Sequence, residues 1–374
     1  MMIDRSKNKE QFFKGCLIGG AIGDALGYAV EFTSYDGIVK SYGEQGIQRY
    51  QLSKNGKALI SDDTQMTLFT ANGLLVGSTR GKMRGAMGAP SGYVYLAYLD
   101  WLTTQGMKKP REAEKISWIK DVPELNEPRA PGNTCLSALM SDQERSLDYP
   151  LNHSKGCGAV MRIAPFGLFY GDRKTRSFLE EAMEIGALTH GHPMSHLSCA
   201  MMAYIIGQII YKDHESIKDI VKKALLVIDK AFKAPIKNEF IELMERAVEL
   251  TENAEKDVDN IAKLGEGWIA EEALAIAVYC ACKYQKMPIN GIIAAVNHSG
   301  DSDSTGAIAG NILGAWNGYD AFPKEWIDDL EIHEVIEEIA TDLASGCPMS
   351  EHSDVYDEQW DNKYVKMKCP VKYN

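Results

Sequence analysis

The sequence predicts an all-α protein, a single-domain orthogonal helical bundle, and three observations support this. Apolar residues recur at i, i+3 and i+4 along most of the chain, the period of a helix that buries one face. Strand-like alternation is scarce, and its clearest run, 163–166, is followed at once by Gly167. No repeat of 20 to 50 residues and no low-complexity linker divides the 374 residues, so one domain is favoured over the two or three that length suggests.

The helical period appears in eleven segments. In chain order they are 11–30, 63–76, 92–104, 177–188, 197–211, 217–232, 237–253, 271–283, 288–296, 305–316 and 324–344. Loops rich in proline and glycine lie between them at 121–133 and 154–158. We expect the helical domain to span 13–345. A polar extension at 1–12 precedes it, and a tail at 346–374, with mixed charges and aromatic residues, should pack on its surface.

Composition excludes some classes of partner. Against 52 Asp and Glu stand 40 Lys and Arg, a net charge of −12, which disfavours nucleic acid and anionic membranes as partners. Residues 191–211 are uncharged, but their apolar part, about 15 residues, falls short of the ~20 that span a bilayer, so a buried helix is expected. Eight cysteines without a CxxC pair, and no signal-peptide region, favour free thiols in the cytoplasm.

Two of the predicted helices carry glycine at every fourth position. These glycines are Gly15, Gly19, Gly23 and Gly27 in one helix, and Gly306, Gly310, Gly314 and Gly318 in or just after the other. Glycine inside a helix costs about 1 kcal/mol relative to alanine. A ridge of glycines at i±4 compensates by letting another backbone approach closely. The two helices are therefore expected at the centre of the bundle, where they can pack against each other.

An acidic cluster stands at the start of one apolar helix. Ser61, Asp62, Asp63 and Thr64 supply carboxylates and hydroxyls, the hard oxygen ligands that Mg²⁺ and Mn²⁺ prefer. The same residues could simply cap the helix, since serine and aspartate are favoured there. On this motif alone, capping is the favoured interpretation.

A second acidic cluster begins the last glycine-bearing helix. Asp301, Asp303 and Ser304 resemble the opening of an EF-hand loop, but its twelfth position is Ile312 where a bidentate glutamate is needed, so an EF-hand is excluded. Capping alone is again possible. Because two such clusters, about 240 residues apart, both precede apolar helices, we expect them to converge on a binuclear metal site at the helix starts.

Taken together, the motifs resemble the ADP-ribosylglycohydrolase family, which includes the dinitrogenase-reductase-activating glycohydrolases. The resembling segments run in family order and nearly fill the chain: GCLIGGAIGDALG at 15–27 with Glu31, SDDT at 61–64, RAPGNT at 129–134, KGCGAVMR at 155–162, TH at 189–190, GEGW at 265–268 and GDSDS at 300–304. The family fold is an all-α bundle with two divalent ions, which agrees with the prediction from periodicity.

The resemblance implies a ligand set for two Mg²⁺ or Mn²⁺ ions: Ser61, Asp62, Asp63, Asp301, Asp303 and Ser304. The family often has threonine directly after the second aspartate, so the ligating hydroxyl is either Ser304 or Thr305. Glu31 matches an acidic residue on the segment after the first helix, close to the scissile bond. Glu31 and Asp303 are the two candidates for acid–base catalysis.

The resemblance also implies substrate-binding residues. The loop with Gly156, Cys157 and Gly158 matches the family's diphosphate loop, where backbone N–H groups can face an anion. Cys157 stands where the family often has asparagine. His190 matches a histidine beside the ribose, and Trp268 lies in the GEGW segment. Without the resemblance, a turn and a hydrogen-bonded helix-end histidine would be the simpler interpretations.

We therefore expect a hydrolase that releases ADP-ribose from ADP-ribosylated proteins, with the cations holding the distal ribose and activating water for attack at C1″. An arginine linkage is favoured because 129–134 and 265–268 look more like bacterial members. Two alternatives stay open: a serine-linked or other O-linked substrate, and a non-catalytic module that binds ADP-ribose. A two-metal phosphohydrolase would use similar ligands, but the family motifs argue against it.

Overall fold

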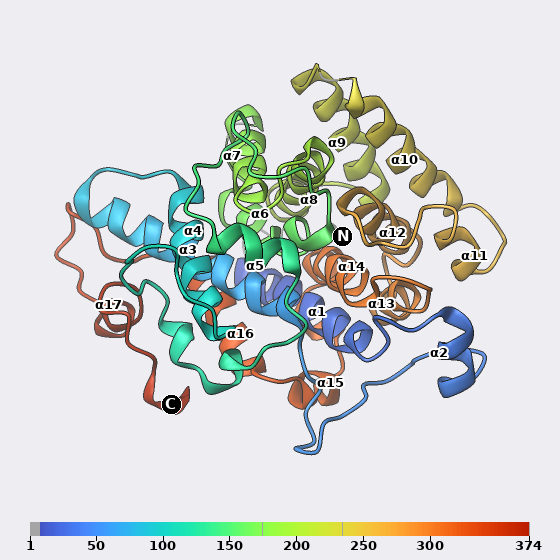
Figure 1. The fold of residues 1–374 in the computed structure, drawn as a ribbon, viewed down its shortest axis with the longest axis horizontal. Helices are drawn as coiled ribbons and strands as arrows, with labels where there is room; N and C mark the ends of the chain where they lie inside the picture. The colour runs from blue at the N-terminus through green and yellow to red at the C-terminus, as the bar shows by residue number, and fades with distance from the viewer. Residues whose placement is uncertain (1–7, 174, 234, 374) are drawn as a thin grey trace.

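Two long helices form the centre of the fold (Figure 1). They are α1 (Lys9–Tyr28) and α14 (Ser302–Asn317) in a computed structural model that describes residues 8–173, 175–233 and 235–373. Their glycine ridges face each other with the helices running in opposite directions. A Cβ atom at Gly15 would lie 2.5 Å from the carbonyl oxygen of Gly314, so no larger residue fits there without a shift. The predicted central pair is confirmed, and its two members pack against each other.

The other helices surround this pair at varied angles (Figure 1). They are α2 (Tyr35–Tyr42), α3 (Asp62–Arg84), α4 (Pro90–Thr104), α5 (Asn133–Met140), α6 (Ala164–Tyr170), α7 (Thr175–Ala187), α8 (Pro193–Tyr211), α9 (Ile217–Ala231), α10 (Ile236–Leu250), α11 (Asp257–Ile261), α12 (Ala270–Lys283), α13 (Pro288–Val296), α15 (Lys324–Asp329), α16 (His333–Ser345) and α17 (Glu358–Tyr364). In the described parts of the chain, β-pairing is limited to three isolated bridges. The all-α prediction is confirmed.

The structure departs from the predicted helices at 324–344 and in its short helices. The segment 324–344 is two helices, α15 and α16, because Ile332 between them adopts a left-handed conformation with φ 49°. The run 163–166 leads into helix α6, with Pro165 in its first turn, where a missing N–H is tolerated. The eight-residue helices α2 and α5 were missed because two turns are too short to establish a period.

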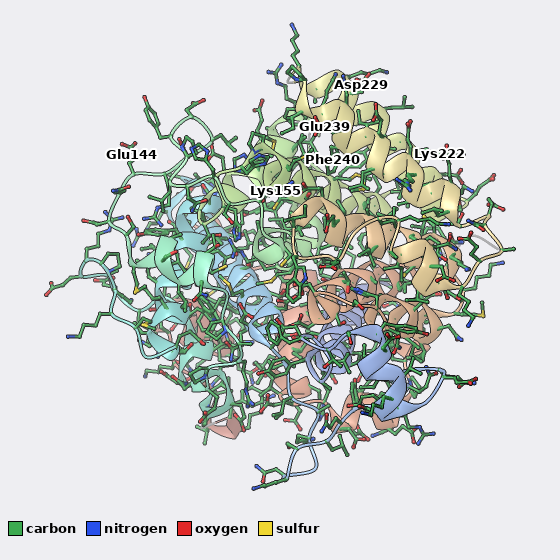
Figure 2. The ribbon with its side chains drawn as sticks, turned by 45° about the vertical axis from the view of Figure 1, so that its right-hand side comes forward. Glu144, Lys155, Lys222, Asp229, Glu239 and Phe240 are labelled. Carbon is green, nitrogen blue, oxygen red and sulfur yellow. The ribbon has the colours of Figure 1, made fainter. Side chains whose placement is uncertain are left out.

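Helices α9 and α10 show how the outer shell is built (Figure 2). Their charged side chains, among them Lys222, Asp229 and Glu239, are exposed, whereas Phe240 is fully buried. Helix α8 is different: it is long and apolar enough to cross a membrane by length and composition, yet 89% of its most apolar window is buried inside the fold. It therefore occupies the position of a core helix, as predicted.

The C-terminal segment lies on the helical domain. Trp360 of α17 is 4% exposed, and its indole N–H donates to the Thr79 hydroxyl of α3 at 2.9 Å. The Lys363 ammonium contacts Glu338 at 2.9 Å and also pairs with Asp342, both on α16. Residues 1–7 of the predicted extension lie outside the described residues, and helix α1 begins at Lys9. The domain limits at 13 and 345 stay a prediction.

Candidate functional site

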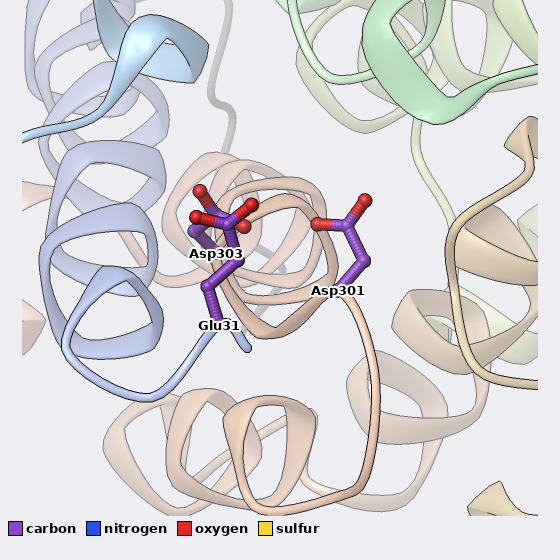
Figure 3. A group of neighbouring side chains, drawn as sticks. All are labelled: Glu31, Asp301 and Asp303. Atoms are coloured by element: carbon purple, nitrogen blue, oxygen red, sulfur yellow. The ribbon is translucent and has the colours of Figure 1, made fainter. Parts of the chain in front are cut away.

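Close packing of α1 and α14 brings a glutamate to the start of α14. Gly27 packs against the backbone of Ser302, so the chain leaving α1 passes directly over the beginning of α14. Glu31 follows three residues after the end of α1. One carboxylate oxygen each from Glu31, Asp301 and Asp303 lies within 4.8 Å of the others (Figure 3). This is the candidate metal centre among the described residues.

The start of α3 is fixed by α1 as well. Asp24 of α1 is fully buried and accepts hydrogen bonds from the Ser61 N–H at 3.0 Å and the Thr64 N–H at 3.1 Å. The Asp62 carboxylate accepts the Gly132 N–H at 3.1 Å. Asp24 therefore positions the first acidic cluster.

Both clusters lie against the C-terminal half of α1, because Asp24 accepts from Ser61 and Thr64 while Gly27 packs against Ser302. Burial, followed by the charges of Asp301 and Asp62, raises the pKa of Glu31 to about 8. Burial raises the pKa of Asp62 to about 7, with Asp24 and Asp301 adding to the shift. Burial, then Asp301 and Asp63, raises the pKa of Asp303 well above its usual range. Convergence of the clusters is what the sequence predicted.

Both clusters also cap their helices, which was the competing interpretation. The Ser61 hydroxyl accepts the Asp63 N–H at 3.1 Å, and Asp301 accepts the Ser304 N–H at 3.2 Å. These capping hydrogen bonds nevertheless do not neutralise the negative charge of the carboxylates. In the described structure no lysine or arginine forms an ion pair with the five cluster carboxylates, which are Glu31, Asp62, Asp63, Asp301 and Asp303.

The unbalanced carboxylates fit divalent cations. Glu31 Oε2 and Asp63 Oδ2 are buried oxygen atoms without a hydrogen-bond partner among the described residues. Unpaired buried charge is strongly unfavourable, and oxygen donors of this kind suit Mg²⁺, Mn²⁺ or Ca²⁺. Thr305 uses its hydroxyl on the backbone, donating to the Ala295 carbonyl at 2.7 Å, so Ser304 is the better placed of the two hydroxyls.

The loops matching the diphosphate and GEGW segments are joined to each other. The Cys157 N–H donates to the Trp268 carbonyl at 3.2 Å, and the Ala270 N–H donates to the Lys155 carbonyl at 2.8 Å. The Cys157 N–H is therefore not free to bind an anion. The predicted diphosphate loop has one fewer backbone N–H group available to an anion than expected. The Cys157 thiol donates instead to Asp301 Oδ2 at 2.7 Å. The predicted diphosphate loop thus touches the metal centre.

His190 faces the same loop through a relay that fixes its ring. A Cβ atom at Gly156 would lie 3.2 Å from His190 Nε2. The buried Arg162 guanidinium donates to the Thr189 hydroxyl at 2.6 Å, and that hydroxyl lies 2.8 Å from His190 Nδ1. The Thr189 hydroxyl therefore accepts from Arg162 and shares a second hydrogen bond with Nδ1, whose direction depends on the ring tautomer. Burial, then Arg162, holds the pKa of His190 well below its usual range, so the ring is neutral.

An aromatic pair borders the metal centre. The rings of Phe32 and Trp268 stack with centroids 5.7 Å apart and planes 17° from parallel. Phe32 is 77% exposed and Trp268 39% exposed, so a wide apolar face meets solvent directly beside Glu31. Trp268 was among the predicted substrate-binding residues, whereas Phe32 was not. A bulky aromatic residue in a polar loop, immediately after the candidate acid, was the available signal.

The fold and the site together define a class: an all-α protein with buried, unpaired carboxylates gathered at two helix starts, suited to divalent cations. The sequence profile of the ADP-ribosylglycohydrolase family matches residues 5–353, and the chain belongs to that family.

Relatives agree with this assignment. An ADP-ribosylarginine hydrolase of Serratia proteamaculans is 26% identical over 88% of this chain and 78% of its own. An ADP-ribosyl-[dinitrogen reductase] glycohydrolase of Rhodospirillum rubrum is 24% identical over 85% of this chain and 90% of its own. A solved structure titled as an ADP-ribosylglycohydrolase-related protein complex shares the fold, with a TM-score of 0.61 and 22% identity over 91% of this chain and 99% of that one.

Proposed function

We propose that the protein is a hydrolase that cleaves the glycosidic bond between ADP-ribose and a protein side chain. Family membership supports hydrolysis of an ADP-ribosyl bond. The observation that carries the proposal for this chain is the group of Glu31, Asp301 and Asp303, whose carboxylate oxygens lie within 4.8 Å of one another without a basic partner in the described structure.

We further propose that Ser61, Asp62, Asp63, Asp301, Asp303 and Ser304 hold two divalent cations, Mg²⁺ or Mn²⁺. Such ions, when bound, supply Lewis-acid stabilisation for ribose hydroxyls and lower the pKa of water. The chain itself fixes the positions of the two groups of metal ligands. Asp24 fixes the start of α3, and the glycine ridges fix the start of α14, so both ligand groups belong to rigid helices. The His190 Nε2 atom lies beside the Gly156–Gly158 loop, and we assign the ring hydrogen to Nε2, where a ribose or diphosphate oxygen could accept it.

Glu31 is our first candidate for proton transfer. It is half-buried at the edge of the cluster, whereas Asp303 is 3% exposed beneath it, so a substrate meets Glu31 first. A carboxyl group at this edge can give a proton to the leaving group or take one from water. Asp303 remains the second candidate.

We propose arginine as the linked side chain. A guanidinium is a planar cation that stacks on aromatic faces, and the exposed Phe32–Trp268 pair offers such a face beside Glu31. The Serratia proteamaculans relative, named for ADP-ribosylarginine, adds support. A serine linkage would need no cation-binding surface at this place.

The test is incubation with Mg²⁺ or Mn²⁺ and proteins modified on arginine or on serine, following release of free ADP-ribose. We expect release from the arginine-linked substrate. Release only from the serine-linked substrate would overturn the linkage while leaving the hydrolase. Binding of ADP-ribose without release from either would support a non-catalytic module instead.

The aromatic pair can be tested with matched variants. Trp268→Ala should lower kcat/KM for the arginine-linked substrate, because the stacking face is lost, and Trp268→Phe should retain most of it. Exposed cation–π contacts contribute about 0.5–1 kcal/mol, so a two- to fivefold loss is expected. An equal loss on a serine-linked substrate would show that Trp268 does not recognise the guanidinium.

A further inference from the structure

A small cavity lies beneath the first acidic cluster, where residues of α1, α3, α14 and α16 meet. It has about 10 Å³ of free volume, which is room for a single water molecule. Of the five cluster carboxylates, Asp63 is the one that lines it. The cavity is therefore distinct from the group formed by Glu31, Asp301 and Asp303, and it meets the proposed ligand set at Asp63.

The polar side chains around this cavity present acceptors. Asp63 Oδ2 and Asn311 Oδ1 have no hydrogen-bond partner among the described residues, and the two residues are 3% and 2% exposed. The hydroxyls of Thr64 and Thr67, which also line the cavity, already donate to other residues. A molecule bound here must therefore supply hydrogen atoms to buried oxygens, which are costly to leave unpaired.

The orientation of the Asn311 side chain is fixed by its other end. The amide Nδ2–H donates to the Cys16 carbonyl of α1 at 2.8 Å, and a carbonyl can accept only from the nitrogen of the amide. Gly20 makes room for this contact, because a Cβ atom there would lie 2.0 Å from Asn311 Nδ2. The atom of Asn311 without a partner is therefore the oxygen.

We propose that the cavity binds one water molecule, which donates to Asp63 Oδ2 and Asn311 Oδ1 and so makes Asn311 a positioning residue for Asp63. Buried waters form about three hydrogen bonds, and the Thr67 hydroxyl supplies the third, since its bond to the Met161 carbonyl is long at 3.4 Å. Water is neutral, so the charge of Asp63 is left for a cation. The positioning role rests on the metal centre proposed above, whereas binding of the water does not.

The water is tested with a high-resolution crystal structure of the metal-free, full-length protein. We expect one ordered water at hydrogen-bond distance, about 2.5–3.0 Å, from both Asp63 Oδ2 and Asn311 Oδ1. An atom at about 2.0–2.4 Å from both oxygens would be a cation. Either that result or a cavity without an ordered water would overturn the inference.

The positioning role is tested with matched leucine variants. Asn311→Leu keeps the shape of the side chain but removes the acceptor, so the Mn²⁺ Kd measured by calorimetry should rise about tenfold, as for other outer-shell partners of metal ligands. The control is Asn72→Leu in α3. Asn72 is fully buried, its amide donates to the Ile116 carbonyl at 3.0 Å and its Oδ1 also lacks a partner among the described residues, but it does not line the cavity. Asn72→Leu should lower the unfolding free energy to a similar extent and leave the Mn²⁺ Kd unchanged.

The outcomes separate this inference from the proposed function. If the wild type binds Mn²⁺ and Asn311→Leu binds it equally well, or Asn72→Leu weakens binding as much, the positioning role fails alone. If the wild type does not bind Mn²⁺, the metal centre fails and the positioning role fails with it. Should Asn311→Leu fold poorly, Thr67→Val removes the third hydrogen bond to the water and should raise the Mn²⁺ Kd about twofold or more. An unchanged Kd in a folded Thr67→Val would contradict the inference.

Discussion

Two parts of the molecule bury several carboxylates together and balance them in opposite ways. At the C-terminal clamp, defined as Glu338 and Asp342 with Lys363 and Lys372, each acid has a lysine partner: Lys363 contacts Glu338 at 2.9 Å and Lys372 contacts it at 2.7 Å. At the acidic cluster, the five carboxylates have no basic partner in the described structure.

The pKa of Glu338 records the difference, whereas burial raises the pKa of Asp342 even though Lys363 opposes the shift. Burial acts to raise the pKa of Glu338, but hydrogen bonds from Lys372 and Lys363 outweigh it and the pKa is lowered. Burial raises the pKa of Glu31 to about 8, and the neighbouring Asp301 and Asp62 add to that shift. The clamp carboxylates are thus paired with lysines of the same chain. The cluster carboxylates have no such partner in the described structure, so a bound cation would balance their charge. This contrast is the physical argument for a metal centre.

The largest expected effect is at the cluster. Asp303→Ala should abolish turnover and metal binding while leaving a folded protein, because it removes a ligand and relieves repulsion. Asp62→Ala should behave in the same way. Calorimetry with Mg²⁺ and Mn²⁺ measures the binding, and wild-type affinity in Asp303→Ala would contradict the two-metal assignment.

The second-largest effect on hydrolysis is expected from removing the titratable proton of Glu31, at the edge of the cluster. Glu31→Gln keeps the size and polarity of the side chain, so ADP-ribose should still bind while hydrolysis falls by about 10²–10⁴-fold. Single-turnover rates measure the step itself. Unchanged rates would transfer the acid–base role to Asp303.

The clamp should respond in stability rather than in activity. Asp342→Ala leaves the largely buried Lys363 with one of its two acids, and breaking a buried pair costs up to about 3–5 kcal/mol of unfolding free energy. Metal affinity should not change. The matched control, Asp303→Asn in the metal-free protein, should be neutral or stabilising, and denaturant unfolding of both variants tests the comparison. Equal destabilisation by Asp342→Ala and Asp303→Asn would show that the clamp and the cluster do not differ in charge balance.

The pH dependence of the metal-free protein should have a definite sign. Folding raises the pKa of Glu31 from 4.5 to about 8 and that of Asp62 from 3.8 to about 7, so the folded state binds more protons between these values. The cluster's contribution to stability should therefore decrease as the pH rises from about 4 to 8. Mg²⁺ or Mn²⁺ should reduce this decrease, and Glu31→Gln should reduce it without metal. Thermal unfolding against pH, with and without chelator, measures it.

The smallest effect concerns Arg162, a buried cation that donates to three uncharged residues: Thr189, Cys135 and Met66. Thr189→Val should break the relay to His190 and weaken ADP-ribose binding by about two- to tenfold, the net worth of one hydrogen bond. Thr189→Ser should retain it. Nitrogen chemical shifts of His190 distinguish the two ring tautomers, and an unchanged tautomer in Thr189→Val would exclude the relay.

Much of the fold was predictable because its signals are local. Helical periodicity marks α3, α8 and α12 directly, and the glycine ridges of α1 and α14 could have only one use, the close approach of another backbone. The break at Ile332 was not predictable, since an isoleucine with positive φ has no sequence signature. The short helices α2 and α5 were not predicted, because two turns are too few to establish a helical period.

The sequence by itself selected the candidate site residues: two acidic clusters, an acid after the first helix, a glycine loop and a histidine. It also left each of them with an ordinary alternative, because a cap and a metal ligand are the same residues at the same position. Only the tertiary structure decided that the clusters face each other without a basic partner in the described chain, that Phe32 stacks on Trp268, and that the Cys157 thiol meets Asp301. These contacts join residues that are far apart in the chain, and their charge balance depends on what burial removes from water.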